Sequence, residues 1–258
     1  MRVNTGGRVL AVALGVSAAV AIRRRRIRWS ILDDPCGSEG LTLPEGELFT
    51  LHTDDGADLA VLVAGDGPVV VLPHCWTGGM SIWAPVARGL VAGGHRVVLY
   101  DQRGHGSSTL GTGPISIDRL GLDLAVVLER LDVNDVVLAG HSMGGMTIQA
   151  LAKVRSDVLA GRVSGVVLAS TAAHTGNLRV PPLAAKAFLG EARSRRLAKR
   201  PVSSDRRVVG AEVHRSHLEA TQAAMLATSG AARAGFLVAM SRMDYRPTLD
   251  NIQVPTRL

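Results

Sequence analysis

Four short runs of β-branched and other apolar residues recur along the middle of the chain. They occupy residues 68–73 (PVVVLP), 95–101 (HRVVLYD), 135–140 (DVVLAG) and 162–171 (RVSGVVLAST). Runs of this length and composition are typical of strands buried on both faces of a sheet. The segments between them have room for crossover helices, at 81–93, at 116–131 and directly after residue 140. This β-α-β-α-β order predicts a doubly wound, mostly parallel sheet with right-handed crossovers.

Two further parts of the chain are a predicted hairpin, which adds to the sheet, and a predicted helical insertion. Residues 48–53 and 57–64 flank the turn-forming Asp-Asp-Gly at 54–56, which predicts an antiparallel hairpin. Residues 172–235 break the strand–helix alternation and predict short helices inserted between two strands. Because loops at the carboxyl ends of the strands cover the ligand crevice of such a sheet, we interpret this insertion as a lid. A helical excursion that only packs against the sheet is the alternative.

The net charge of +7 is confined to one end of the 258-residue chain. Residues 1–32 hold seven of the 29 basic residues and no acidic one, so residues 33–258 hold 22 basic and 22 acidic residues. A neutral body does not require a nucleic-acid partner, and the local basic run at 191–207 is typical of a solvated helix face. The two cysteines, Cys36 and Cys75, form neither a metal-binding pattern nor a disulfide framework.

Residues 9–22 form an uncharged, mostly apolar run that is followed by Arg-Arg-Arg-Arg-Ile-Arg. A helix of this length reaches about 21 Å, which is short of a hydrocarbon core of about 30 Å unless flanking residues extend it. A cleaved signal peptide is one reading, but arginines stand where small residues should form the cleavage site. We therefore favour an uncleaved membrane anchor. The excess of arginine after the run would keep the rest of the chain on the cytoplasmic side.

The pentapeptide Gly140-His141-Ser142-Met143-Gly144 fits the pattern G-x-S-x-G. It closes a predicted buried strand and opens a predicted helix, which is the setting of a nucleophile elbow. Small residues on both sides of the serine allow the tight turn that brings strand and helix together. Ser142 is thus the candidate nucleophile. The main-chain N–H of Met143, at the helix N-terminus, is a candidate oxyanion donor.

The chain resembles the α/β-hydrolase superfamily over about residues 45–258. Besides the elbow, residues 72–83 (LPHCWTGGMSIW) resemble the family's His-Gly-x segment after the third strand, and residues 100–108 (YDQRGHGSS) its Asp-x-Arg-Gly-x-Gly-x-Ser turn. Residues 243–258 are similar to the run that leads into the strand after the lid. We therefore divide the chain into residues 1–32, which hold the expected anchor and its Arg-rich flank, and residues 33–258, which the resemblance implies to be one α/β-hydrolase domain with the lid at about 172–235.

The resemblance adds Trp76 to the expected site. By its position after the third strand, its main-chain N–H would be the second oxyanion donor beside Met143. Cys75 departs from the pattern, because the family usually has glycine there, and the added side chain would alter the approach of this loop. We expect Cys75 to be a buried small residue rather than a reactive thiol.

The resemblance also implies a triad acid and then a histidine, both later in the chain than Ser142. The family places them after the strand that Val254–Leu258 begins, so we expect the hydrolase domain to be incomplete at its carboxyl end and to lack its last strands. Substitutes within the chain are His74, His105, His141, His174, His214 and His217, and the acid Asp244. We expect structural or surface roles for these histidines and no triad role for Asp244.

The expected function is a serine hydrolase that cleaves carboxylic esters of apolar acyl groups through an acyl-enzyme on Ser142. Lipases, esterases and cofactor-free haloperoxidase-like members share the Gly-His-Ser-Met-Gly-Gly form. The alternatives are therefore haloperoxidase-like chemistry, or a non-catalytic or remnant protein with a hydrolase-like pocket. No metal, nucleotide or flavin motif is visible, so we expect no cofactor and a small apolar ester as the partner.

Overall fold

The computed structural model describes residues 30–32, 37–176, 179–189 and 212–258. Its centre is a seven-stranded sheet of order β2-β3-β5-β4-β6-β7-β9. The strands are β2 (Glu47–His52), β3 (Asp58–Ala64), β4 (Val69–Leu72), β5 (Arg96–Tyr100), β6 (Val136–His141), β7 (Val163–Ala169) and β9 (Thr256–Arg257). The β2–β3 and β3–β5 pairs are antiparallel and the others are parallel. The predicted hairpin and doubly wound sheet are confirmed.

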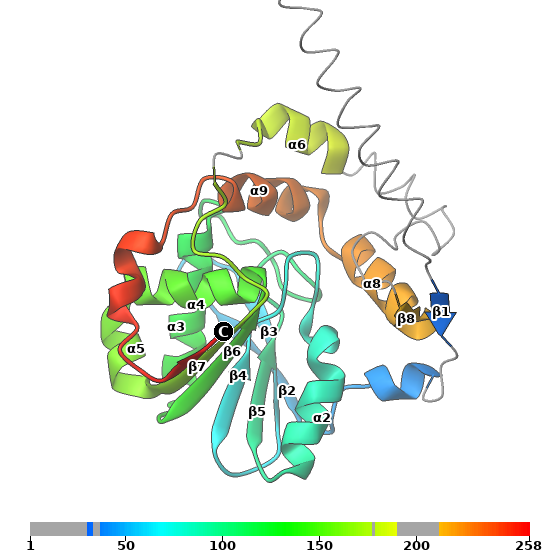
Figure 1. Ribbon diagram of the computed structural model, residues 1–258, viewed down its shortest axis with the longest axis vertical. Helices are drawn as coiled ribbons and strands as arrows, with labels where there is room; N and C mark the ends of the chain where they lie inside the picture. The colour runs from blue at the N-terminus through cyan, green and yellow to red at the C-terminus, as the bar shows by residue number, and fades with distance from the viewer. Residues whose placement is uncertain (1–29, 33–36, 177–178, 190–211) are drawn as a thin grey trace, which may run out of the picture.

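Helices cover both faces of the sheet (Figure 1). One face carries α2 (Ala84–Ala92), preceded by the 3-10 turn η2 (Met80–Trp83). The other carries α3 (Ile117–Arg130), α4 (Met143–Val154) and α5 (Ser156–Arg162). Alternate residues of β4 point to opposite faces of the sheet. Val70 and Leu72 pack in the apolar cluster that includes α2, whereas Val71 packs in the cluster that includes α3 and α4. The strands are therefore buried on both faces, as their β-branched composition predicts.

The predicted insertion is helical but differs from the expectation in two details. It contains α6 (Pro182–Leu189), α8 (Arg215–Ala227) and α9 (Gly230–Met240), so its last helix extends five residues past the predicted boundary at 235. It also contains a short strand, β8 (Glu212–His214), which pairs in parallel with β1 (Ser30–Leu32). The segment that follows the N-terminal arginines is thus hydrogen-bonded to the segment that leads into α8. Helix α9 contacts α6 and α3, and its residues Ala232 and Phe236 share an apolar cluster with Met143 and Met146 of α4.

The remaining helical segments are short. The 3-10 turn η1 (Gly37–Leu41) precedes the sheet and contacts α8, and η4 (Arg246–Asn251) leads from the insertion into β9. Among the described residues no single helix is long and apolar enough to cross a membrane, and α8 with α9 passes only as a span broken by a 96° bend. The anchor predicted at 9–22, the basic run at 191–207 and Cys36 lie outside the described residues.

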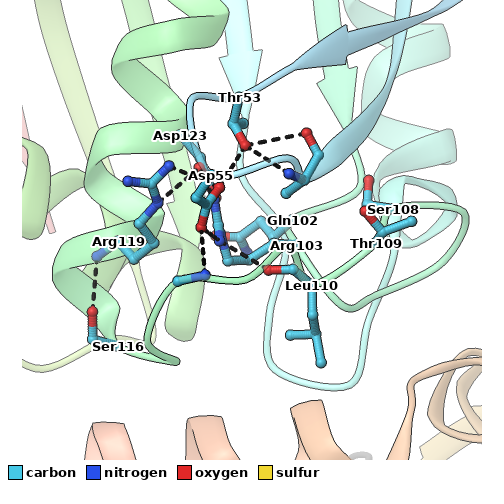
Figure 2. A network of polar contacts seen from close by, with 12 residues as sticks. Thr53, Asp55, Gln102, Arg103, Ser108, Thr109, Leu110, Ser116, Arg119 and Asp123 are labelled. Atoms are coloured by element: carbon cyan, nitrogen blue, oxygen red, sulfur yellow. Dashed lines mark hydrogen bonds and ion pairs between the residues drawn. The ribbon is translucent and has the colours of Figure 1, made fainter.

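A buried ion cluster fastens the β2–β3 hairpin to the loop after β5 and to α3 (Figure 2). The guanidinium of Arg103 donates two hydrogen bonds of 2.6 Å to the carboxylate of Asp123 on α3, and another of 2.7 Å to Asp55 in the hairpin turn. Arg119 of α3 donates to Asp55 as well, at 2.9 Å. Because the side chains of Arg103 and Asp123 are each only 1% exposed, each charge depends on the other for compensation.

Candidate active site

Ser142 lies at a sharp turn between β6 and α4, in a conformation that side chains rarely adopt. Its φ of 53° and ψ of −114° leave the strand direction at His141, and helix α4 begins at the next residue, Met143. Such a backbone costs on the order of 1–3 kcal/mol and persists only where the surrounding structure enforces it. The strand–turn–helix context predicted for the elbow is thus present.

The glycines around Ser142 are required by space. A Cβ at Gly140 would lie 2.5 Å from Gly144, and a Cβ at Gly144 would lie 2.1 Å from the carbonyl oxygen of Pro73. The second distance also shows that the first turn of α4 touches the end of β4. The loop that carries Trp76 therefore starts against the elbow, and Trp76 and Met143 belong to the same apolar cluster.

The loop after β7 holds the elbow from its other side. The Ser142 N–H donates to the carbonyl of Ala169 at 2.9 Å, and the hydroxyl of Thr171 donates to the Ser142 carbonyl at 2.7 Å. A Cβ at Gly145 would lie 2.7 Å from Thr171, so this neighbour needs glycine too. Thr171 could not be predicted from the sequence, because a single hydroxyl after a strand gives no signal of its long-range partner.

His74, in the first position of the oxyanion loop, is a buried structural residue. The main-chain N–H of Gln102 donates to its Nε2 at 2.9 Å, so the proton is on Nδ1, which donates to the carbonyl of Cys75 at 2.8 Å. The Gln102 amide in turn donates to the His74 carbonyl and accepts from the hydroxyl of Thr147 on α4, each at 2.6 Å. Burial lowers the pKa of His74 to about 4, so this ring is neutral and both its nitrogens are occupied.

No hydrogen bond joins any of the other described histidines to Ser142 Oγ. His105 is fully buried beside Phe236, and burial lowers its pKa to about 3. His141 turns the edge of its ring toward Trp83, and partial burial lowers its pKa. His174 accepts a hydrogen bond from the N–H of Gly176. The rings of His214 and His217 pack edge to face, with their centroids 5.4 Å apart.

The acid Asp244 pairs with a cation rather than with a histidine of the elbow. Its carboxylate accepts from the guanidinium of Arg246 at 2.6 Å, which lowers the pKa of Asp244 to about 2. Ser142 Oγ makes no hydrogen bond with any of the residues that the structure describes. The geometry therefore brings together the candidate nucleophile and the two candidate oxyanion segments, and no histidine of the described part of the chain is hydrogen-bonded to Ser142.

Cys75 is half-buried, and burial raises the pKa of its thiol. Its Sγ lies 3.0 Å from the place where a Cβ of Gly78 would be, and the Gly78 N–H donates to the Cys75 carbonyl at 3.0 Å. The loop thus accommodates the larger residue by having glycine three positions later. A thiol with a raised pKa is a poor nucleophile, in line with the predicted role of Cys75 as a packing residue.

The family model of the alpha/beta hydrolase fold matches residues 68–245, which is more than half of the chain. The chain therefore belongs to the α/β-hydrolase family of enzymes. Its solved structural relatives include a hydrolase from Pseudomonas aeruginosa, which is 28% identical with a TM-score of 0.62. The match covers 82% of this chain and 78% of the chain of that hydrolase. They also include the enol-lactonase from Burkholderia xenovorans, 26% identical with a TM-score of 0.64, covering 81% and 79%.

Curated relatives match a shorter stretch. The 3-oxoadipate enol-lactonase 2 of Acinetobacter baylyi is 33% identical over 128 residues, which cover 49% of this chain and 46% of that protein. The non-heme haloperoxidase of Rhodococcus erythropolis is 34% identical over 130 residues, covering 50% and 43%. The match spans less than half the length of each of these curated relatives. The chain is thus similar to proteins named as a hydrolase, as enol-lactonases and as a non-heme haloperoxidase.

Proposed function

We propose that this chain carries the nucleophile of a serine hydrolase acting on carboxylic esters of apolar acyl groups. The observation that carries the proposal is the strained backbone of Ser142, held between a buried strand and a helix N-terminus. Strain of this kind is retained where it serves a site. The relatives named as enol-lactonases favour an ester bond as the target.

The proposed mechanism forms and breaks an acyl-enzyme. Ser142 Oγ attacks the ester carbonyl while a base takes its proton, and the main-chain N–H groups of Met143 and Trp76 stabilise the negative oxygen. Collapse of the tetrahedral intermediate expels the alkoxide, which receives the proton, and water then releases the acid by the same steps. No described histidine hydrogen-bonds to Ser142 Oγ, so the proposal takes the base to come from outside the described residues.

The test is covalent labelling of the purified protein with a fluorophosphonate, followed by intact mass. We expect one adduct in the wild type and none in Ser142→Ala. Ser170→Ala is the matched control, because Ser170 is exposed, lies next to the site and also has a positive φ, of 48°, but does not precede a helix. An unlabelled protein with a cooperative thermal melt would mean that Ser142 has no base in this chain and would favour the non-catalytic alternative.

A second candidate function is cofactor-free, peroxide-dependent chemistry, which the non-heme haloperoxidase relatives favour. The two functions separate in one assay series, with p-nitrophenyl butyrate alone and with a halogen acceptor, bromide, acetate and hydrogen peroxide. Ester turnover without peroxide supports the hydrolase. Halogenation that requires peroxide, without ester turnover, supports the alternative.

We also propose that residues 9–22 attach the protein to a membrane with the hydrolase domain on the cytoplasmic side. The support is the apolar run and its arginine flank in the sequence. Cell fractionation with and without residues 1–28 tests the anchor. Equal pelleting of both forms would exclude it.

A further inference from the structure

The oxyanion loop is connected to the lid by the side chain of Trp76. Its indole N–H donates to the main-chain carbonyl of Arg233 on α9, at 3.2 Å and across 157 positions of the chain. The ring also packs against the cluster that contains Met143 of the elbow and Phe236 of α9. One residue thus carries the candidate oxyanion donor on its main chain and a lid contact on its side chain.

Arg233 itself fastens three parts of the lid to one another. It is only 3% exposed, and its guanidinium donates to carbonyl oxygens of Leu189 at 3.0 Å, Met225 at 2.6 Å and Thr228 at 2.5 Å. Leu189 ends α6, Met225 lies in the last turn of α8, and Thr228 precedes α9. A buried cation at the carbonyl ends of two helices is favoured by their dipoles. The position of α9 therefore depends on Arg233.

The loop needs such an external contact, because its backbone is strained beside Trp76. Thr77 has a φ of 57°, a conformation that a β-branched residue adopts only when its surroundings enforce it. The hydrogen bond from the Gln102 N–H to His74 also restrains this loop, but it acts two residues before Trp76. The indole hydrogen bond is the contact that restrains Trp76 itself from the lid side.

We propose that Arg233 is a positioning residue, which holds α9 so that its carbonyl keeps Trp76, and with it the oxyanion donor, in place over Ser142. Lid and oxyanion hole are then one unit, and movement of α9 away from the sheet disassembles the hole. The inference rests on the proposed function, because it takes the Trp76 N–H as an oxyanion donor.

The first test is the rate of fluorophosphonate labelling in Trp76→Phe, which removes the indole N–H and keeps an aromatic ring. We expect labelling to slow about tenfold, and kcat for an ester to fall by a similar factor with KM little changed, because a misplaced donor weakens only the transition state. Trp83→Phe is the matched control and should label like the wild type, since the Trp83 indole N–H is buried without a partner among the described residues. Equal rates in Trp76→Phe and wild type would overturn the inference.

The second test does not require activity. In protein labelled with 15N at its three tryptophans, the indole N–H of Trp76 should exchange slowly with solvent, and Arg233→Met should speed this exchange about tenfold or more while Trp83 is unchanged. Trp76→Phe and Trp83→Phe assign the signals. A wild type that does not label refutes the proposed function alone. An indole of Trp76 that exchanges equally fast in wild type and Arg233→Met overturns the inference, whatever the labelling result.

Discussion

Replacing Arg103 with methionine should destabilise the domain far more than an ordinary surface change. Methionine fills much of the same space, so the loss comes mainly from the charges of Asp123 and Asp55, which remain. Asp123 is 1% exposed, and removing one partner of a buried ion pair costs about 3–5 kcal/mol. For a domain of this size that corresponds to a lower melting temperature by about 6–20 °C. Thermal and urea unfolding followed by circular dichroism measure it.

The pH dependence identifies the cause of this loss. Burial already raises the pKa of Asp123, and without Arg103 it rises further. A carboxyl group whose pKa is raised in the folded state stabilises the fold below its unfolded pKa and loses that contribution as pH rises. The difference between Arg103→Met and wild type should therefore be smaller at pH 5 than at pH 8. Loss of packing alone would leave the difference independent of pH.

A surface arginine provides the matched control. Arg155 also bonds two carboxylates, Glu129 and Asp157, but its side chain is 31% exposed and those carboxylates are more exposed still. Exposed pairs contribute about 0–1 kcal/mol, so Arg155→Met should change stability little. If Arg103→Met costs no more than Arg155→Met, the ion cluster does not stabilise the fold in the way argued.

Three further predictions concern the site. Ser142→Gly should be more stable than Ser142→Ala by about 1 kcal/mol in urea unfolding, because glycine adopts the φ of 53° without strain; equal stability would mean that the elbow is not strained. Thr171→Val should slow fluorophosphonate labelling about fivefold by removing the hydroxyl that donates to the Ser142 carbonyl, and an unchanged rate would exclude that role. The pKa of His74 in the folded protein is lowered to about 4, so neutral His74 contributes fully to the free energy of unfolding above pH 6.5, and this contribution is lost as pH falls from 6.5 to 4. Through this group the wild type should lose up to about 1.4 kcal/mol of stability per pH unit in that range. The His74→Gln variant should lose correspondingly less. Denaturant midpoints at pH 7, 5.5 and 4.5 measure this, and parallel curves for the two proteins would contradict it.

The sheet and the elbow are predictable from the sequence because their signals are local. A β-branched run such as Val69–Leu72 indicates a buried strand by itself, and Gly140 and Gly144 indicate the tight turn around Ser142. The β1–β8 pair has no such signal. Its strands are three residues each and about 180 positions apart, so only the folded insertion brings them together.

The residues that hold the site in place were missed for the same reason. Three residues donate these hydrogen bonds: Thr171 and Arg233 to main-chain carbonyls, and Gln102 to a ring nitrogen of His74. Every residue has a main-chain carbonyl, so the sequence does not show which one accepts such a bond. Arg233 in particular stands in an otherwise uncharged stretch, 220–241, and nothing in that stretch indicates that its guanidinium is buried. Its burial depends on how α6, α8 and α9 meet, which no local periodicity specifies.

Two of these contacts have a common consequence for how Ser142 would react. Ser142 and Thr77 both have a strained backbone. Ser142 and Trp76, the residue before Thr77, each form a hydrogen bond with an element distant in the sequence. Thr171 comes from the loop after β7, and the carbonyl that holds Trp76 comes from α9. Because the restraints are separate, loosening one leaves the other in place, so Thr171→Val and Trp76→Phe should slow labelling by factors that multiply in the double variant. A double variant no slower than Trp76→Phe alone would show that lid and elbow move as one body.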